Sequence, residues 1–361
     1  RGNENMGILV HKYGGTSVGT TEKIKRIAKR VIAEKENVPQ KGTITIEKTG
    51  ELFSSVEIQE GKLQDRYKPI YAESGLEGAE FEIRAAEDVY TPDGTLRYSA
   101  GEVVDTLTTG PDGTATSKEL YLGKFEIVET KAPHEMVINE EPIPVELTYA
   151  GQEVSVTSTS VSVYNERQKV LVKLFKDLEK DELFEIGTGD EILNVYFALY
   201  AAEDLTAADG SMIPADGLIE VAGVQADGTL TFSADLPIGS YYVKEYSTNE
   251  HYLISDETYP VVFEYGGQDT AVVEIVVNDG DAILNQIIRG SISGIKVDET
   301  GEPLPGAVFG LFKADCTEFT AENANPDRRI CRRWQLQLHG CALRHLADQR
   351  NLYRGRICSL R

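Results

Sequence analysis

Three lysines continue rows of apolar residues that a β-strand would turn toward a buried core. Side chains alternate between the two faces of a strand, so residues two apart share a face. An ammonium group buried without a partner costs on the order of several kcal/mol, so each lysine must be paired, neutralised or consumed. The three rows are Ile44, Ile46 and Lys48; Val172, Leu174 and Lys176; and Ile292 with Lys296.

A glutamate and an asparagine share this inward orientation near the first lysine. Glu129 continues the row of Phe125 and Ile127, and Asn165 ends the row of Val161 and Val163. A lysine that burial has deprotonated is a nucleophilic amine, which can attack the side-chain carbonyl of an asparagine. A protonated glutamate in an apolar surrounding can donate a hydrogen bond to that carbonyl and relay protons while ammonia leaves. These residue types therefore predict an isopeptide bond, an uncharged amide between two strands.

The middle of the chain repeats itself in register, which extends the prediction to a second site. Phe81 and Phe197 each open a predicted strand, and an Asp-Gly pair ends 13 residues after each of them. A glutamate follows each phenylalanine by 48 residues, at Glu129 and Glu245. A third copy begins at Gly290 and is not completed.

The repeat assigns one triad to each complete copy. The choice of Asn285 rests on spacing, because it precedes Lys296 by 11 residues, as Asn165 precedes Lys176. Asn278, which closes the apolar run 272–277, is the alternative. A plainer interpretation also stays open, in which the lysines reach water from strand ends and the asparagines are turn residues. The predicted triads are Lys48, Glu129 and Asn165 in the first copy, and Lys176, Glu245 and Asn285 in the second.

Short alternating segments separated by Asp-Gly, Pro-Asp-Gly and Gly-Gly turns predict an all-β fold. This spacing is typical of antiparallel β-sandwiches in tandem. The predicted organisation is a strand–loop–helix fragment over 1–40, a first module over 41–167, a second over 168–288, the start of a third over 289–324, and an irregular tail over 325–361.

The first copy carries a longer insertion than the second. Lys48 and Phe81 are 33 residues apart, whereas the matching pair in the second copy is 21 apart. The insertion contains Phe53, Tyr67 and Tyr71, so two interpretations remain: a loop that binds a host or matrix ligand, or a plain surface excursion.

Composition narrows the classes of partner. The chain has 361 residues, of which 41% are hydrophobic, and a formal net charge of −23. The acidic residues concentrate in 42–324, and this negative charge would repel nucleic acid and anionic lipid, so neither is an expected partner. No stretch of the sequence is apolar enough to insert into a membrane. All four cysteines lie in the last 46 residues, so either the compartment is reducing or the β modules use a covalent link other than a disulfide.

Three motifs carry a resemblance to a known family: Lys-Val-Asp at 296–298, Gly-Ala-x-Phe-x-Leu at 306–311 and more loosely 78–83, and the strand ending in Ala-Pro at 125–133. With these motifs the modules resemble the SpaA-type and collagen-adhesin B-type (prealbumin-like) modules of Gram-positive pilins and surface adhesins. The resemblance implies a stalk, pilin or adhesin backbone at the cell wall, stabilised by autocatalytic Lys–Asn isopeptide bonds. It implies other pilin or surface subunits, or host extracellular-matrix proteins, as partners. It also implies no cofactor, no metal and no enzyme turnover; wall anchoring by a sortase would require a signal outside this sequence.

The two ends differ from the modules. Residues 6–36 resemble the opening of aspartate kinases, in which a strand, a glycine-rich loop and a helix N-terminus hold phosphate. Because the match stops near residue 36, we expect an inactive remnant without kinase activity. At the other end, codons can be chosen for the residues from Asn325 onward such that translation one nucleotide later gives a continuation of the third module. This predicts that the tail is the product of a frameshift, and that the third module therefore has no partner for Lys296. The kinase-like residues are Lys12, Gly14, Gly15, Thr16 and Ser17.

Overall fold

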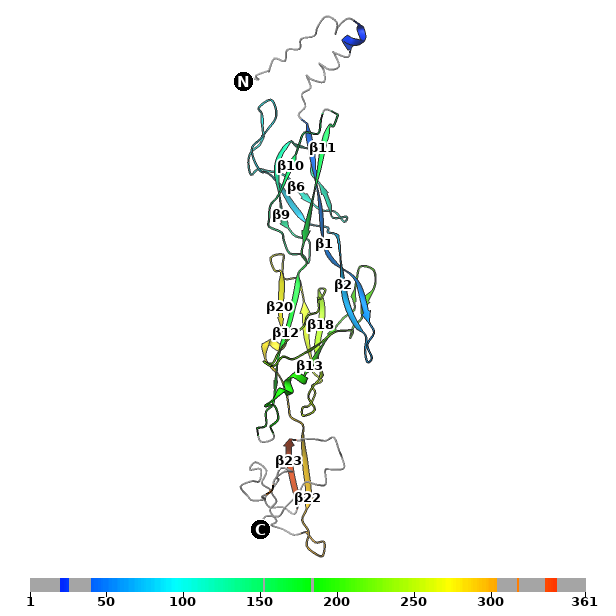
Figure 1. Cartoon of the computed structure of the whole chain (residues 1–361), viewed down its shortest axis with the longest axis vertical. Helices are drawn as coiled ribbons and strands as arrows, with labels where there is room; N and C mark the ends of the chain where they lie inside the picture. Colours follow the sequence, from blue (N-terminus) through cyan, green and yellow to red (C-terminus); the bar gives the residue numbers. More distant parts are fainter. Residues whose placement is uncertain are drawn as a thin grey trace. The chain divides into compact units, whose positions relative to one another are not determined.

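The computed structural model of the chain is almost entirely β, which confirms the predicted fold class (Figure 1). It describes residues 20–25, 40–151, 153–182, 185–303, 317 and 335–342. Within these residues no helix has the length and apolar character needed to cross a bilayer. The chain forms two compact units. Unit 1 contains Arg1–Gly50, Ser74–Pro133 and Ile138–Asn165, and unit 2 contains Glu51–Glu73, His134–Val137 and Glu166–Arg361.

Unit 1 is built from two sheets. The first is a four-stranded antiparallel sheet in the order β10-β9-β3-β6. In the second, β1 pairs in parallel with β11, the last strand of the unit, and antiparallel with β7 and β8. The strands are β1 (Lys41–Gln59), β3 (Glu80–Ala85), β4 (Val89–Tyr90), β5 (Leu96–Tyr98), β6 (Val103–Thr108), β7 (Thr114–Thr116), β8 (Leu120–Tyr121), β9 (Gly123–Lys131), β10 (Ile143–Leu147) and β11 (Val156–Asn165).

The core of unit 1 follows from the two-residue alternation of its strands. On β1 every second residue from Gly42 to Gly50 is buried, and β3 and β9 show the same period. These inward rows meet in one cluster because each strand has only one apolar face to remove from water. The cluster includes Ile44, Ile46, Phe81, Ile83, Phe125, Ile127, Val145, Leu147 and Val163.

Unit 2 repeats this plan. One sheet has the order β2-β16-β13-β18-β19, and the other has β12 between β17 and β20, with β21 also paired to β12. As in unit 1, the first strand of the module, β12, runs parallel to the last ones, β20 and β21. The elements are β2 (Arg66–Gly75), β12 (Lys169–Leu178), the 3-10 turn η2 (Asp190–Asn194), β13 (Tyr196–Ala201), β14 (Leu205–Thr206), β15 (Met212–Ile213), β16 (Leu218–Gly223), β17 (Thr229–Thr231), β18 (Gly239–Ser247), β19 (Thr258–Phe263), β20 (Val272–Val276), the 3-10 turn η3 (Val277–Gly280) and β21 (Ile283–Asn285).

The insertion of the first copy belongs to unit 2. The end of β1 and strand β2 are neighbours in a sheet and form a hairpin over Glu51–Glu73. The short segment His134–Val137 also belongs to unit 2. Both segments lie within the sequence range predicted for the first module, so the compact units are not contiguous in sequence.

The chain ends are described only in part. Residues 21–25 are helical, and the Thr20 hydroxyl accepts a hydrogen bond from the Lys23 backbone N–H at 3.2 Å, as a helix N-cap does. In the tail, where the sequence predicts irregular structure, β23 (Gln335–Ala342) pairs antiparallel with β22 (Arg289–Ile295). The other residues of the predicted kinase-like fragment and of the tail lie outside the described residues.

Candidate cross-linking sites

Lys48, Glu129 and Asn165 meet in the core of unit 1. They come from three strands, β1, β9 and β11, and their exposed fractions are 1%, 5% and 1%. The parallel register places Lys48 opposite Val163 and Gly50 opposite Asn165, so the asparagine lies two residues along from the lysine on the neighbouring strand. The predicted inward orientation is therefore present for all three side chains.

The three side chains of the first site contact one another directly. Lys48 Nζ donates to Asn165 Oδ1 and lies 3.3 Å from Glu129 Oε1. The same carboxylate oxygen accepts a hydrogen bond from Asn165 Nδ2 at 3.0 Å. The sequence argument expected the glutamate at the asparagine carbonyl, whereas in the structure it faces the amide nitrogen. One carboxylate oxygen is thus within reach of both the amine and the amide nitrogen.

Burial favours the neutral amine at the first site. Removal from water lowers the pKa of Lys48 below its ordinary value of 10.5, against the attraction of Glu129, which raises it. The lysine side chain has no route to solvent at an exposed fraction of 1%. The alternative in which Lys48 reaches water from a strand end does not fit this geometry.

Lys176, Glu245 and Asn285 occupy matching positions in unit 2. They lie on β12, β18 and β21, with exposed fractions of 3%, 3% and 2%. Asn285 Nδ2 donates to Glu245 Oε1 at 2.5 Å, the same contact as in the first site. Lys176 Nζ donates instead to two backbone carbonyls, those of Asp177 at 2.9 Å and Ile283 at 2.7 Å.

Burial at the second site also shifts the lysine toward its neutral form. Burial lowers the pKa of Lys176 to about 8, although Glu245 and Asp177 act in the opposite direction. The carbonyl oxygen of Asn285, Oδ1, is buried and accepts no hydrogen bond. A buried acceptor without a donor costs free energy, so a hydrogen-bond donor placed next to this oxygen would stabilise the site.

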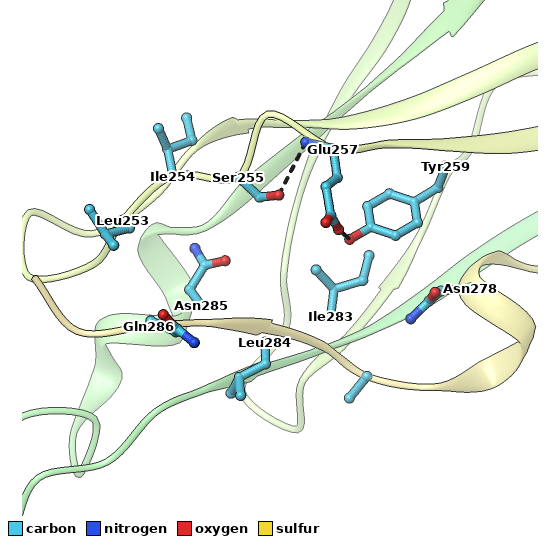
Figure 2. Close-up of a pocket in the computed structure, with 11 residues that line it drawn as sticks. Leu253, Ile254, Ser255, Glu257, Tyr259, Asn278, Ile283, Leu284, Asn285 and Gln286 are labelled. Carbon is cyan, nitrogen blue, oxygen red and sulfur yellow. Dashed lines mark hydrogen bonds between the residues drawn. The ribbon is translucent and has the colours of Figure 1, made fainter.

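A cavity of about 430 Å³ opens beside Asn285 (Figure 2). Its lining includes Ser255 and Ile283, and Figure 2 shows Asn285 and Asn278 on either side of Ile283. Asn278 is exposed, has a φ of 58° and donates through Nδ2 to the backbone oxygen of Asp281 at 3.0 Å. It therefore behaves as a turn residue, and Asn285 is the asparagine that contacts Glu245.

Two features that hold the triads in place were not found from sequence. In each unit a backbone N–H ten residues after the glutamate donates to its second oxygen: Asn139 to Glu129 at 2.8 Å, and Ser255 to Glu245 at 2.7 Å. The matched spacing of ten residues was available, but neither Asn139 nor Ser255 carries a side chain that marks this role.

The second feature is a glycine beside each lysine. The Lys48 N–H donates to the Gly113 oxygen at 2.7 Å, and the Lys176 N–H donates to Gly228 at 2.8 Å. Both glycines have positive φ, 78° and 83°, and a Cβ on either would lie within 2.6 Å of the lysine's backbone oxygen. Only glycine fits this turn, because a side chain meets both strain and a collision.

Thr248 distinguishes the second site from the first. Its hydroxyl accepts a hydrogen bond from Asn285 Nδ2 at 2.9 Å, so both hydrogens of that amide have acceptors. The matching residue three positions after Glu129 is Ala132, which has no hydroxyl.

The remaining predicted residues form no third site among the described residues. Lys296 donates to the backbone oxygen of Val297 at 2.9 Å and is half-buried. No group of three or more potential metal ligands occurs in the described part of the chain. The kinase-like residues at 12–17 lie outside that part.

The fold and the repeated buried triads define a protein of tandem β-sandwich modules. The family model of the SpaA prealbumin-like fold domain matches residues 70–161 and 184–279, once in each module. The chain therefore belongs to this family, which confirms the resemblance seen in the sequence. The match begins after residue 36 and adds no support to the aspartate-kinase resemblance.

Several solved structures are similar to this chain at low identity. The Bacillus anthracis TIE protein is 17% identical over 83% of this chain and 44% of its own, with a TM-score of 0.48. The minor pilin GBS52 of Streptococcus agalactiae is 16% identical over 72% of this chain and 99% of its own, with a TM-score of 0.23. A BcpA major pilin variant of Bacillus cereus is 14% identical over 84% and 86%, with a TM-score of 0.29. This chain thus spans less than half of the first of these proteins. Comparison with curated proteins gives no match.

Proposed function

We propose that each unit closes one intramolecular isopeptide bond, Lys48 to Asn165 and Lys176 to Asn285, and that the chain is a structural stalk or pilin segment. The observation that carries this proposal is the first site. There an amine with a lowered pKa, a carboxamide and a carboxyl group contact one another in a core that excludes water.

The reaction needs no group beyond the triad. The neutral Lys48 Nζ attacks Asn165 Cγ, the Nζ–Cγ bond forms, and the Cγ–Nδ2 bond breaks. Glu129 takes a proton from the attacking nitrogen and gives one to the departing nitrogen, which leaves as ammonia. The carboxyl group returns to its starting state, so the step is a self-directed single turnover and not enzyme catalysis.

The position of the bonds suits a structural role. In each unit the cross-link joins the first strand to the last, which run parallel to each other. Tension that enters a module on one of these strands and leaves on the other would pass through a covalent amide instead of hydrogen bonds alone. Family membership, the acidic body and the cysteine-free modules support a place on the outside of a Gram-positive cell, with other pilin or surface subunits as partners.

Intact-protein mass spectrometry tests the chemistry. Each bond removes one ammonia, about 17 Da, so we expect a deficit of about 34 Da for the whole chain. Lys48→Arg and Lys176→Arg should each restore one ammonia, and peptide mapping should find the two linked pairs. A mass that equals the uncorrected sequence would refute the proposal.

An adhesin role remains a prediction without assigned residues. The insertion aromatics Phe53 and Tyr67 pack against the core of unit 2, and Tyr71 lies against Arg167. They are half-buried and form no open aromatic surface for a host ligand.

A further inference from the structure

We propose that the second module carries a binding site for a β-hairpin, and that the hairpin Glu51–Glu73, inserted in the first module, is its resident ligand. This inference does not depend on the cross-linking chemistry. It rests on the contacts of the hairpin with residues that, like the hairpin itself, belong to unit 2.

The hairpin joins unit 2 through its backbone. Strand β2 pairs in parallel with β16, the outermost module strand of the sheet that carries Glu245, at one position, with Arg66 opposite Leu218. On the other arm, the backbone oxygens of Phe53 and Ser54 accept hydrogen bonds from Ala208 at 3.0 Å and Asp209 at 3.1 Å. These contacts give hydrogen-bond partners to backbone groups of β16 and of the turn between β14 and β15.

Apolar side chains fix the register of the hairpin. Phe53, Val56 and Tyr67 pack against the buried cluster of unit 2. The Val56 N–H also donates to the Ser211 hydroxyl at 2.9 Å. The hairpin tip has a different character, since Leu63 is 91% exposed and contributes nothing to the docking surface.

A buried arginine closes the docking surface. Arg167 is 6% exposed, and its guanidinium carbon lies 3.7 Å from the ring centre of Tyr71. It pairs with the carboxylates of Asp235 and, at 3.8 Å, Glu51. A buried cation needs such partners, and two of these three, Tyr71 and Glu51, come from the hairpin. Without the hairpin, Arg167 would keep only Asp235 of these partners.

The hairpin can be removed from the first module without breaking that module's own pairing. The Leu76 N–H donates to the Lys48 oxygen at 3.0 Å, so the two ends of the excursion already meet. This contact makes an excision variant practical: Gly50 joined to Ser74 by a short glycine linker in the full chain.

The test uses this excision variant with a synthetic peptide of residues 50–74. We expect the excised chain to lose hydrogen-exchange protection at β16 and at residues 207–211, with unit 1 unchanged. The peptide should then bind with saturation and restore that protection, whereas the intact chain, whose site is filled, should not bind it. A peptide carrying Phe53→Ser and Tyr71→Ser is the control that should fail to bind.

Point variants decide the question if the excised second module does not fold. In the full chain, Phe53→Ser with Tyr71→Ser should raise exchange at residues 207–211 by about tenfold or more, and Leu63→Ser should not. Unchanged exchange in the double variant, or peptide binding that is equal for the intact and excised chains, would overturn the proposal. Neither outcome would alter the mass deficit, which separates this test from that of the cross-links.

Discussion

Replacing Glu129 with Gln tests the first cross-link most directly. The substitution keeps the size and the hydrogen bond to the amide but removes the carboxyl group that moves protons. We expect this variant to lack one of two ammonia losses, so that its mass deficit falls from about 34 Da to about 17 Da. Glu126→Gln lies on the solvent face of the same strand and should leave both bonds intact.

The cost in stability follows from the loop that the bond closes. Lys48 and Asn165 are 117 positions apart, and cross-linking a loop of that length removes unfolded-state entropy worth about 5 kcal/mol at 25 °C. Urea unfolding followed by circular dichroism should show unit 1 less stable by roughly this amount in Glu129→Gln, with unit 2 unchanged. The reasoning is refuted if the variant still loses two ammonias, or if it loses the bond and keeps its stability.

Three further predictions concern the second site and the glycine turns. In Asn285→Ala, which cannot cross-link, Lys176 keeps a pKa of about 8 when folded and 10.5 when unfolded. Between these pH values the unfolded state binds more protons than the folded state, so the free energy of unfolding should rise with pH from about 8 to 10.5, by up to about 3 kcal/mol. Urea titrations at several pH values measure this rise, which should vanish when Lys176→Met is added. Thr248→Val removes one acceptor from the Asn285 amide. A time course of intact mass after synthesis should show the second ammonia lost more slowly than the first. Timing equal to that of the parent chain would show that the Thr248 hydroxyl has no part in the reaction. Gly113→Ala places a Cβ 2.5 Å from a backbone oxygen of β1 at a φ of 78°, whereas Gly94→Ala at a φ of 82° meets no atom within 4 Å. Thermal unfolding should therefore show a larger loss for Gly113→Ala, and similar losses would mean that φ strain alone matters.

Strand parity and repeat spacing were sufficient to predict the fold class and which side chains point inward. Lys48 and Lys176 could be recognised because each stands where the alternation requires an apolar residue. The preference for Asn285 over Asn278 came from spacing, and the structure places Asn285 at Glu245. The formation of the two bonds stays a prediction, for which intact-protein mass is the test.

Other features could not be predicted because they depend on tertiary contacts without a local pattern. The N–H groups of Asn139 and Ser255 act through the backbone, which every residue possesses. The orientation of the Asn165 amide depends on which neighbour offers a donor and which an acceptor. The two lysines look alike in sequence, yet Lys176 donates to the backbone oxygens of Asp177, its neighbour on β12, and of Ile283 on β21.

The hairpin shows why sequence boundaries and folding units differ here. An insertion with three aromatic residues in an acidic module is compatible with an exposed binding loop, and nothing in its own sequence names its partner. The partner is supplied by Arg167, which belongs to unit 2 and contacts Tyr71 and Glu51 of the hairpin as well as Asp235. If the proposed docking holds, the folding of the second module depends on a hairpin about 100 positions before Arg167 in the sequence. Each unit is made of three separate segments of the chain, because the polypeptide leaves and re-enters each unit more than once. The proposed cross-links would then join the first and last strands of modules that are interleaved in sequence.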